Sequence, residues 1–367
     1  MNVGIDLRLH AYAPGGISRY ARRLARALVD LMPAEQVTLL PHRKEQQALA
    51  LPGVRTRRLF TPPHHPLERW LLGAEVWPLG LDVLHSTDFI PPAWGARRHV
   101  VTVHDLNFLY YPDYLTAEAR RYYNDQIAWA VAHADAIVVD SYATQRDLAQ
   151  LLAVTPDRVT VAHLAADERF RPLPSSEVGP TLERHGLTPG YLLFVGVWEP
   201  RKNLLGLFEA LGILRERGAT RPLVVAGRPG WLDEEIYAAV RDLELEAWIR
   251  FVERPSVDEL VALYNGATLL VLPSFYEGFG LPALEAMQCG TPTVVSNRAS
   301  LPEVVGNAGL LVDPDEPTSI ADACWQLLRD PDARARLREL GFEQARAFTW
   351  RATAEKTLQA YRAALAP

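Results

Sequence analysis

Two cationic side chains follow a strongly apolar run in the second half of the chain, where they could bind an anion. The run Tyr191–Gly196 is typical of a buried strand, and Arg201 and Lys202 come soon after it, at the start of an expected helix. Ligands of parallel α/β sheets bind where strands end and helices begin, because backbone N–H groups are unpaired there. Two cations at that position predict a phosphate or diphosphate site, with ordinary surface charge as the alternative interpretation.

A second segment with suitable chemistry follows the apolar run TLLVLP and reads FYEGFGLPALEA. Gly278 and Gly280 let backbone N–H groups approach a phosphate closely. Glu277 and Glu285 are separated by seven residues. A carboxylate accepts two hydrogen bonds, which suits the vicinal hydroxyls of a ribose or a hexose. For Glu285, complementation of the helix dipole is the alternative.

Two further candidates lie in the first half of the chain. Gly15 and Gly16 precede an expected helix, where free amides could face a phosphate, although a simple turn before a helix explains them equally. His104 ends the apolar run HVVTVH beside Asp105. A histidine at a strand end suits hydrogen bonding or proton transfer, and a histidine that only caps the strand is the other interpretation.

Two enzyme classes that use similar motifs fit the sequence poorly. The segment GFGLPA satisfies G-x-G-x-x-A, but a dinucleotide site also needs an acidic residue about 20 positions on, at the next strand end. Asn297 and Arg298 follow that strand instead. Paired glutamates also occur in glycosidases, yet a cation cluster and two glycine-containing loops indicate a phosphorylated ligand, which glycosidases do not need.

The elements that must position these residues alternate between short apolar runs and stretches of helix length, which predicts βαβ units and doubly wound parallel sheets. We expect a first domain over residues 1–168, a linker rich in Pro and Ser over 169–189 and a second domain over 190–349. Residues 350–367 form an amphipathic helix. The expected strands are Val3–Leu7, Val37–Leu40, Val83–His85, His99–His104, Ala136–Asp140, Val159–Ala162, Tyr191–Gly196, Leu223–Gly227, Ile249–Val252, Thr268–Leu272, Pro292–Ser296 and Gly309–Val312.

Composition excludes several classes of protein. The chain has 367 residues with 38 basic and 44 acidic side chains, a net charge of −6, so a dedicated nucleic-acid-binding protein is not expected. Cys289 and Cys324 are too few for a disulfide framework or a cysteine metal site. Asp6 and Arg8 interrupt the first apolar run, which therefore does not resemble a signal peptide. No run approaches the roughly 20 apolar residues that span a bilayer, so we expect a cytoplasmic protein.

A row of arginines on the helix after the paired glycines leaves one question about localisation open. These side chains are spaced for one helix face, which predicts either a solvated face or contact with an anionic membrane, here the inner face of the plasma membrane. The residues are Arg19, Arg22, Arg23 and Arg26.

Taken together, the segments PGGISRYARRLARAL, VTVHDLNFLYYP, GVWEPRKNL and FYEGFGLPALEAMQCGTPTVVS resemble those of retaining, nucleotide-sugar-dependent glycosyltransferases of the GT-B fold. The resemblance is to group 1 or family 4, which contains bacterial mannosyltransferases of polysaccharide biosynthesis, and it covers essentially the whole chain. It implies two Rossmann-like domains facing across a cleft, with the donor mainly on the second and the acceptor on the first. It also implies that the final helix returns to the first domain.

For the second domain, the resemblance implies a role for each motif residue. Arg201 and Lys202 would hold the donor diphosphate and stabilise the leaving group. Glu285 would bind the ribose, and Glu277 the transferred sugar. The backbone amides of the stretch Phe279–Leu281 would meet the sugar or the diphosphate.

For the first domain, the resemblance implies that His104 contacts the donor sugar and that Gly15 and Gly16 close over the phosphates. The nucleobase would lie near residues 251–254, where the sequence FVERP departs from the commoner pattern of small residues. The contact to the base is therefore left open.

The expected reaction is the retaining transfer of a hexose to a hydroxyl of a glycan or lipid-linked sugar, with mannose from GDP-mannose as the expected donor and UDP-sugars as close competitors. No metal ion and no cofactor besides the donor substrate is expected. Two alternatives are an enzyme of the sugar-nucleotide epimerase type and a sugar-nucleotide-binding protein without catalysis. Retention predicts a front-face path, with a covalent intermediate as the alternative.

Overall fold

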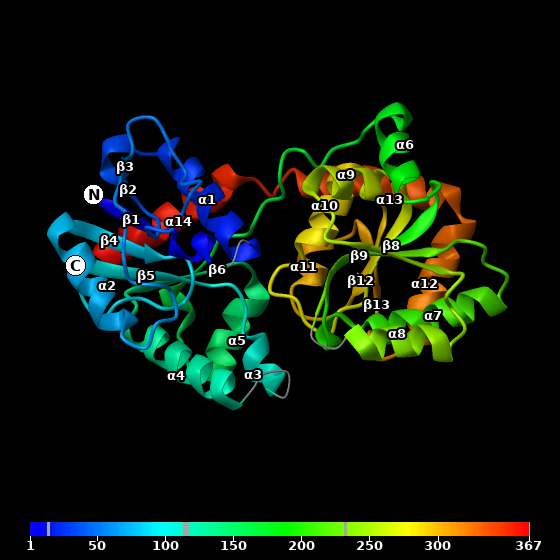
Figure 1. Ribbon diagram of the computed structural model, residues 1–367, viewed down its shortest axis with the longest axis horizontal. Coiled ribbons are helices and arrows are strands. Elements are labelled where there is room, and N and C mark those ends of the chain that lie inside the picture. The colour runs from blue at the N-terminus through cyan, green and yellow to red at the C-terminus, as the bar shows by residue number, and fades with distance from the viewer. Residues whose placement is uncertain (13–14, 113–116, 231–232, 367) are drawn as a thin grey trace. The chain divides into compact units, whose positions relative to one another are not determined.

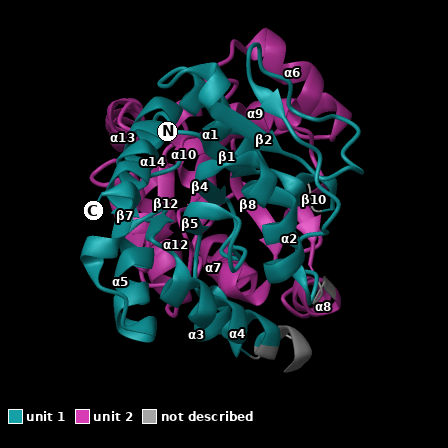
Figure 2. Cartoon of the chain, turned by 90° about the vertical axis from the view of Figure 1, so that its left-hand side faces the viewer, with its two compact units in different colours: residues 1–164, 349–367 teal, residues 165–348 magenta. Residues whose placement is uncertain are grey.

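The computed structural model describes residues 1–12, 15–112, 117–230 and 233–366. The chain divides into two compact units (Figure 2). Unit 1 comprises Met1–Leu164 and Thr349–Pro367, and unit 2 comprises Ala165–Phe348. Each unit is built around its own parallel sheet, and each is described separately below.

The sheet of unit 1 has seven parallel strands in the order β3-β2-β1-β4-β5-β6-β7. All six strands expected in this half occur. The seventh, β3, is absent from the expectation because its two residues are both exposed and carry no apolar pattern. The strands are β1 (Val3–Asp6), β2 (Val37–Leu40), β3 (Arg55–Thr56), β4 (Leu81–Ser86), β5 (Ala96–Val103), β6 (Ala136–Val139) and β7 (Val159–Val161).

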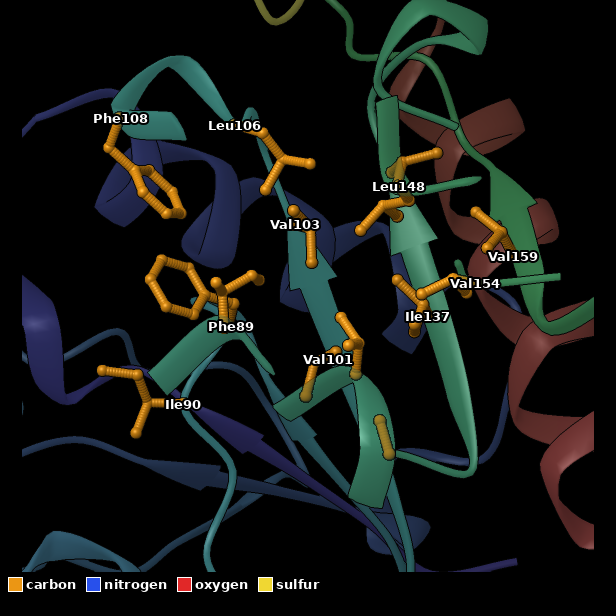
Figure 3. Packing of buried hydrophobic residues seen from close by; sticks show 14 residues of the cluster. Phe89, Ile90, Val101, Val103, Leu106, Phe108, Ile137, Leu148, Val154 and Val159 are labelled. Atoms are coloured by element: carbon orange, nitrogen blue, oxygen red, sulfur yellow. The ribbon is translucent and has the colours of Figure 1, made fainter. Parts of the chain in front are cut away.

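Helices cover both faces of this sheet, as the continuous apolar runs of its strands require. The helices α1 and α14 pack together on one face, and α2, α4 and α5 supply apolar side chains to the other. Figure 3 shows one cluster of this core, in which Val101 and Val103 of β5 lie between Phe89 and Phe108 on one side and Leu148 on the other. The helices are α1 (Gly16–Val29), α2 (Glu68–Val76), α3 (Asn107–Tyr110), α4 (Ala117–His133), α5 (Tyr142–Leu152) and α14 (Trp350–Leu365).

The sheet of unit 2 has six parallel strands in the order β10-β9-β8-β11-β12-β13. Its strands are β8 (Tyr191–Trp198), β9 (Leu223–Pro229), β10 (Ile249–Glu253), β11 (Ala267–Leu272), β12 (Thr293–Ser296) and β13 (Gly309–Val312). The helices α7 and α12 pack together, while α9, α10 and α13 form a second layer (Figure 1). The helices are α6 (Ser175–Arg184), α7 (Leu204–Glu216), α8 (Asp233–Asp242), α9 (Val257–Gly266), α10 (Leu281–Cys289), α11 (Leu301–Val305), α12 (Pro317–Arg329) and α13 (Pro331–Ala345).

The expected fold class of two Rossmann-like, doubly wound parallel-sheet domains is confirmed. Both sheets contain the strand order 3-2-1-4-5-6 when strands are counted within a unit. In such sheets the order of the strands reverses between the first and the fourth strand. Ligands bind at the carboxyl ends of these two strands. The reversal points are β1 and β4 in unit 1, and β8 and β11 in unit 2.

The segment expected as a linker needs correction. Residues 169–189 contain the helix α6, whose Val178 and Leu182 are buried. This helix packs on α9, so the segment is part of unit 2. Its Pro and Ser residues mark the start of a helix rather than an irregular connection, and the units divide after Leu164. The helix α14 packs on α1 and on the strands of unit 1.

Within the described part of the chain, no helix combines the length and the apolar character needed to cross a membrane.

Candidate functional site

A buried ion pair lies at the reversal point of unit 2. Lys202 follows β8 and Glu277 follows β11, two neighbouring strands, so the loops after them meet at one edge of the sheet. The Lys202 ammonium lies 2.6 Å and 2.7 Å from the two carboxylate oxygens of Glu277. Both side chains are buried. The structure thus joins two residues that are 75 positions apart.

Arg201 extends this pair toward the rim of the site. Its Nη1 donates to the carbonyl of Tyr276 at 3.2 Å and lies 3.4 Å from Glu277, and its Nε donates to Glu199 at 3.0 Å. Arg201 is less deeply buried than Lys202. Two cations and two carboxylates therefore balance each other in this structure. A phosphate can therefore bind to these two cations only by sharing them with the carboxylates or by displacing the carboxylates.

The pKa values of the pair favour the ionised form of Glu277. Burial alone would raise the pKa of Glu277, but the charges of Lys202 and Arg201 outweigh burial and lower it. Burial lowers the pKa of Lys202, and Arg201 adds to this shift against the opposing effect of Glu277. The Glu277 carboxylate therefore helps to keep the Lys202 ammonium charged. The charge of the ammonium then depends on the group that replaces this carboxylate when a ligand binds.

Three polar residues that the sequence does not single out hold the site in place. Ser274 donates to Oε1 of Glu277 at 2.8 Å. Asn203 adopts a left-handed conformation at the start of α7, donates to the carbonyl of Pro273 and caps the helix. The buried Ser300 lies 2.8 Å from the carbonyl oxygens of both Glu277 and Phe279. Two of them carry a sequence signal, because Ser274 comes two residues after the end of β11 and Asn203 stands at the N-cap position of α7.

The start of α10 supplies backbone donors in the same region. Gly280 has φ +99°, in the left-handed region that favours glycine, and no side chain caps this helix start. A Cβ at this position would lie 2.6 Å from Leu301, so a larger residue would not fit. Phe279, Gly280 and Leu281 therefore lie where the sequence predicts amides that can approach an anion.

Glu285 lies further along α10 and has a partner that the sequence does not reveal. Its Oε2 accepts a hydrogen bond of 2.8 Å from the Tyr264 hydroxyl, which comes from α9. Both residues are buried, and the ring of Phe170 packs edge-on against Tyr264. This bond fixes the orientation of one carboxylate oxygen.

His104 in unit 1 is held from both ring nitrogens. It follows β5, and Asp140 follows the neighbouring β6 in register, which places Nδ1 2.6 Å from the Asp140 carboxylate. Nε2 lies 3.0 Å from the carbonyl of Thr87. Since both partners are acceptors, the ring donates twice and is an imidazolium. In this arrangement it cannot accept a proton, and it can donate to a ligand only by giving up its bond to Thr87 or Asp140.

This arrangement predicts a pH-dependent stability. Burial would lower the pKa of His104, but Asp140 outweighs burial and raises it from 6.5 to about 9. The stabilisation is complete below pH 6.5 and is lost as the pH rises through about 9. We expect the free energy of unfolding to fall by on the order of 3 kcal/mol over this range. Denaturant titrations from pH 6 to 10 measure it. If the free energy of unfolding changed equally with pH in the wild type and in His104→Asn, the prediction would be contradicted. His133→Gln, at an exposed histidine, is the control and should keep the wild-type pH dependence.

Gly15 and Gly16 differ in part from expectation. Gly15 has φ −162°, an extended conformation open to any residue, and its amide donates to Ser18 at 2.8 Å. The expectation of a free amide at Gly15 is therefore wrong for this structure, because the capping serine satisfies it. A Cβ at Gly16 would meet no atom of the described residues within 4 Å. Pro14 in the same segment lies outside the described residues.

The arginine row lies on α1 as its spacing predicts. Arg19 and Arg26 are exposed, and Arg22 donates to the carbonyl of Gln47 at 2.8 Å. Contact between this row and an anionic membrane stays a prediction.

A second charged cluster, missed at the level of sequence, lies at the reversal point of unit 1. Arg8 is almost fully buried, and its Nη2 lies 2.6 Å from both Asp6 and Glu68. Burial lowers the pKa of Arg8, but the two carboxylates outweigh burial and raise it. Its Nη1 donates to the carbonyl of Thr61 at 3.0 Å. The sequence signal that could have revealed this cluster is the pair Asp6 and Arg8, two opposite charges around the end of the first strand.

Beside this cluster, a polar cavity of about 20 Å³ has room for about one hydroxyl group or water molecule. Arg8, His64, Ser86 and Asp88 contribute to its lining. His64 lies 3.0 Å from Asp88. No residue in the described part of the chain hydrogen-bonds to the buried hydroxyl of Ser86, so the cavity offers an unsatisfied polar group.

Among the described residues, no group of three or more His, Cys, Asp or Glu side chains is placed to hold a metal ion.

Two family models match the two halves of the chain. The model described as Glycosyltransferase Family 4 matches residues 14–170, and the one described as Glycosyl transferases group 1 matches residues 183–344. The second match contains the Lys202–Glu277 pair.

Among curated proteins, the chain is 36% identical over 282 residues to the O-antigen chain mannosyltransferase B of Escherichia coli, covering 76% of this chain and 74% of that protein. It is 34% identical over 260 residues to the D-inositol 3-phosphate glycosyltransferase of Corynebacterium glutamicum (strain R), covering 68% of this chain and 62% of that protein.

Among solved structures, HepE of Anabaena in complex with UDP and glucose superposes with a TM-score of 0.77 at 16% identity. The superposition covers 98% of both chains, so the likeness extends over both units.

Proposed function

Since this chain belongs to the GT-B glycosyltransferases of group 1 and family 4, we propose that it is a retaining hexosyltransferase. The proposed donor is GDP-mannose, and the proposed acceptor is a hydroxyl of a glycan or lipid-linked sugar. The mannosyltransferase at 36% identity supports mannose. The observation that carries the proposal is the meeting of Arg201, Lys202 and Glu277 at the reversal point of unit 2.

In this proposal, unit 2 binds the donor through cations for its diphosphate and through carboxylates for its hydroxyl groups. Arg201, Lys202 and the start of α10 receive the diphosphate, and Glu285 receives the ribose hydroxyls. Glu277 turns from Lys202 to the hydroxyls of the sugar. Because Lys202 and Glu277 neutralise each other in this structure, donor binding exchanges one ion pair for two contacts with the same ligand. That exchange limits the desolvation cost of each buried charge.

The chemical step breaks the bond between the anomeric carbon of the sugar and the diphosphate oxygen. Negative charge develops on the departing diphosphate, so cations and helix amides fixed in advance lower the barrier. The acceptor oxygen attacks from the face that the diphosphate leaves, and its proton passes to a diphosphate oxygen. This front-face path retains the anomeric configuration, and a covalent intermediate is the alternative.

We propose that the reaction needs neither a metal ion nor a cofactor beyond the donor. Arg201 and Lys202 are the charges assigned to the diphosphate in place of a divalent ion. Full activity after treatment with EDTA supports this part, and activity restored by Mg²⁺ or Mn²⁺ contradicts it.

Unit 1 is the proposed site of the acceptor. The polar cavity at the carboxyl ends of β1 and β4 can take a single hydroxyl, and no described residue hydrogen-bonds to the Ser86 hydroxyl there. Gly15, Gly16 and His104 belong to the same unit, and we propose that they contact the phosphates and the donor sugar as the family resemblance implies. Gly15 does so by exchanging the bond of its amide to Ser18 for one to the ligand. His104 acts as a donor rather than as a base, by exchanging its bond to the Thr87 carbonyl for one to the sugar.

Donor binding is tested by a thermal-shift series with GDP-, UDP-, ADP- and TDP-sugars. At a 100-fold excess over Kd, the correct donor stabilises the folded protein by about 2.7 kcal/mol, a rise in Tm of about 3–4 °C for a chain of this length. We expect the largest shift with GDP-mannose. The protein HepE binds UDP, so UDP-sugars are the informative competitors. Glu285→Gln should reduce the shift, whereas Glu209→Gln, at an exposed position of α7, should not.

Release of nucleoside diphosphate separates the proposed function from its alternatives. A transferase releases it only in the presence of an acceptor. An epimerase converts the donor without release, and a binding protein without catalysis does neither. A Tm shift without turnover on any glycan acceptor would favour the last of these.

A further inference from the structure

Large apolar side chains lie exposed around helix α2 of unit 1. Figure 1 shows the position of this helix. Three of these side chains are tryptophans, with exposed fractions of 62% for Trp70, 66% for Trp77 and 39% for Trp94. Soluble proteins rarely expose so many large side chains in one place, and such patches mark interaction sites. We call these residues the aromatic patch: Phe60, Leu67, Trp70, Leu71, Trp77 and Trp94.

Helix α2 is apolar on two opposite faces. Leu72 and Val76 point inward and join a core cluster of unit 1. Leu67, Trp70 and Leu71 lie at the spacing of the other face and are exposed. A helix on the surface of a globular protein normally carries polar residues on that outer face. The core therefore does not explain the outer residues of α2.

The members of the patch from other segments are fixed against the same helix. Trp94 lies over Gly73 of α2, where a Cβ would be 2.8 Å from its ring. The rings of Trp77 and Trp94 are 5.8 Å apart. On the other side, the backbone amide of Phe60 donates to Glu75 of α2 at 2.6 Å. The patch is thus one surface built from three segments of unit 1.

A strongly basic segment borders the patch at Phe60. Residues 41–60 contain five Lys or Arg and one Glu, a net charge of 5 − 1 = +4 in a chain whose total is −6. All five cations are exposed, while Glu45 is buried. The guanidinium of Arg43 lies 5.2 Å from the ring centre of Phe60, so cations and aromatic groups meet directly. We call these five cations the basic rim: Arg43, Lys44, Arg55, Arg57 and Arg58.

We propose that the aromatic patch and the basic rim together dock on a membrane surface that contains anionic lipids. Tryptophan prefers the boundary between headgroups and acyl chains, and Lys and Arg are attracted to anionic headgroups. A second copy of the chain fits less well. A two-fold dimer would place the same patch against itself and bring the two basic rims together. This inference goes beyond the glycosyl-transfer function and does not depend on it.

Co-sedimentation with lipid vesicles tests the proposal on the full chain. We expect the protein to bind vesicles of phosphatidylcholine with 30% phosphatidylglycerol, and to bind pure phosphatidylcholine at least about tenfold more weakly. Binding to the anionic vesicles should fall as salt rises toward 0.5 M, because the Debye length shortens. Trp70→Ser/Trp77→Ser should weaken it at least about tenfold, since each Trp contributes a large apolar area.

Matched controls separate the patch from general effects. Leu205→Ser/Leu311→Ser removes two exposed apolar side chains from unit 2 and should leave vesicle binding unchanged. Arg55→Glu/Arg57→Glu should weaken binding, whereas Arg241→Glu/Arg336→Glu, at two exposed arginines of unit 2, should not. An unchanged Tm and donor-induced shift show that the variants are folded.

Three results would overturn the proposal. The first is wild-type protein that ignores anionic vesicles. The second is equal binding by the wild type and Trp70→Ser/Trp77→Ser. The third is a dimer in analytical ultracentrifugation that dissociates in this variant, without vesicle binding by the wild type, because it would assign the patch to a second copy.

Discussion

Lys202→Ala is expected to lower kcat by about 10²- to 10³-fold, while the KM for the acceptor stays within about twofold. The physical reason is that the ammonium meets charge that develops on the departing diphosphate, so its loss raises the barrier more than it weakens binding of the ground state. The measurement is the initial rate of acceptor-dependent nucleoside diphosphate release under saturating donor.

Folding must be controlled in this experiment, because Lys202→Ala leaves the buried Glu277 carboxylate without its ammonium. The double variant Lys202→Met/Glu277→Gln removes both charges at similar volume, and it should recover stability but not activity. Lys356→Ala, on the exposed side of α14, is the matched control and should keep wild-type kcat. A folded Lys202→Ala enzyme with near-normal kcat would refute the role of Lys202.

Arg8→Ala is expected to destabilise the protein by about 3–5 kcal/mol, the largest effect on stability that we predict. The guanidinium is almost fully buried and bonds to Asp6, Glu68 and the carbonyl of Thr61. Its removal leaves an uncompensated carboxylate in a buried position. Denaturant titration followed by circular dichroism measures the loss.

Two variants show whether the loss comes from unpaired charge. Arg8→Met/Glu68→Leu removes the cation together with its more deeply buried carboxylate, so it should be more stable than Arg8→Ala. Arg26→Ala on the exposed side of α1 should change the unfolding free energy by less than about 0.5 kcal/mol. If Arg8→Ala matched Arg26→Ala, the cluster would be unimportant for stability.

Much of the fold follows from local sequence patterns. Every expected strand occurs, because parallel strands covered on both faces leave long apolar runs such as YLLFVG and VVTVH. The two failures are also local. Strand β3 is two exposed residues long, and α6 begins in a segment whose Pro and Ser residues resemble those of a linker. Both elements are stabilised mainly by their neighbours.

The candidate site was predictable in composition but not in its contacts. Arg201, Lys202 and Glu277 could be chosen because each follows a strand end, and Glu285 because it shares a motif with Glu277, with seven residues between them. Tyr264 could not, because it lies inside a helix with no distinguishing motif, yet it binds Glu285. The hydrogen-bond partner of a side chain depends on which helices pack side by side. Local sequence patterns do not reveal this packing.

The sequence by itself therefore determined the class of the protein, the strands and the positions at which chemistry can occur, since hydrophobic periodicity and strand ends are local properties. Only the tertiary structure decided that Lys202 and Glu277 neutralise each other and that His104 donates from both nitrogens. It also decided that the outer face of α2 stays exposed. Charge state and exposure depend on residues brought together by the order of the strands, up to 75 positions apart in the Lys202–Glu277 pair.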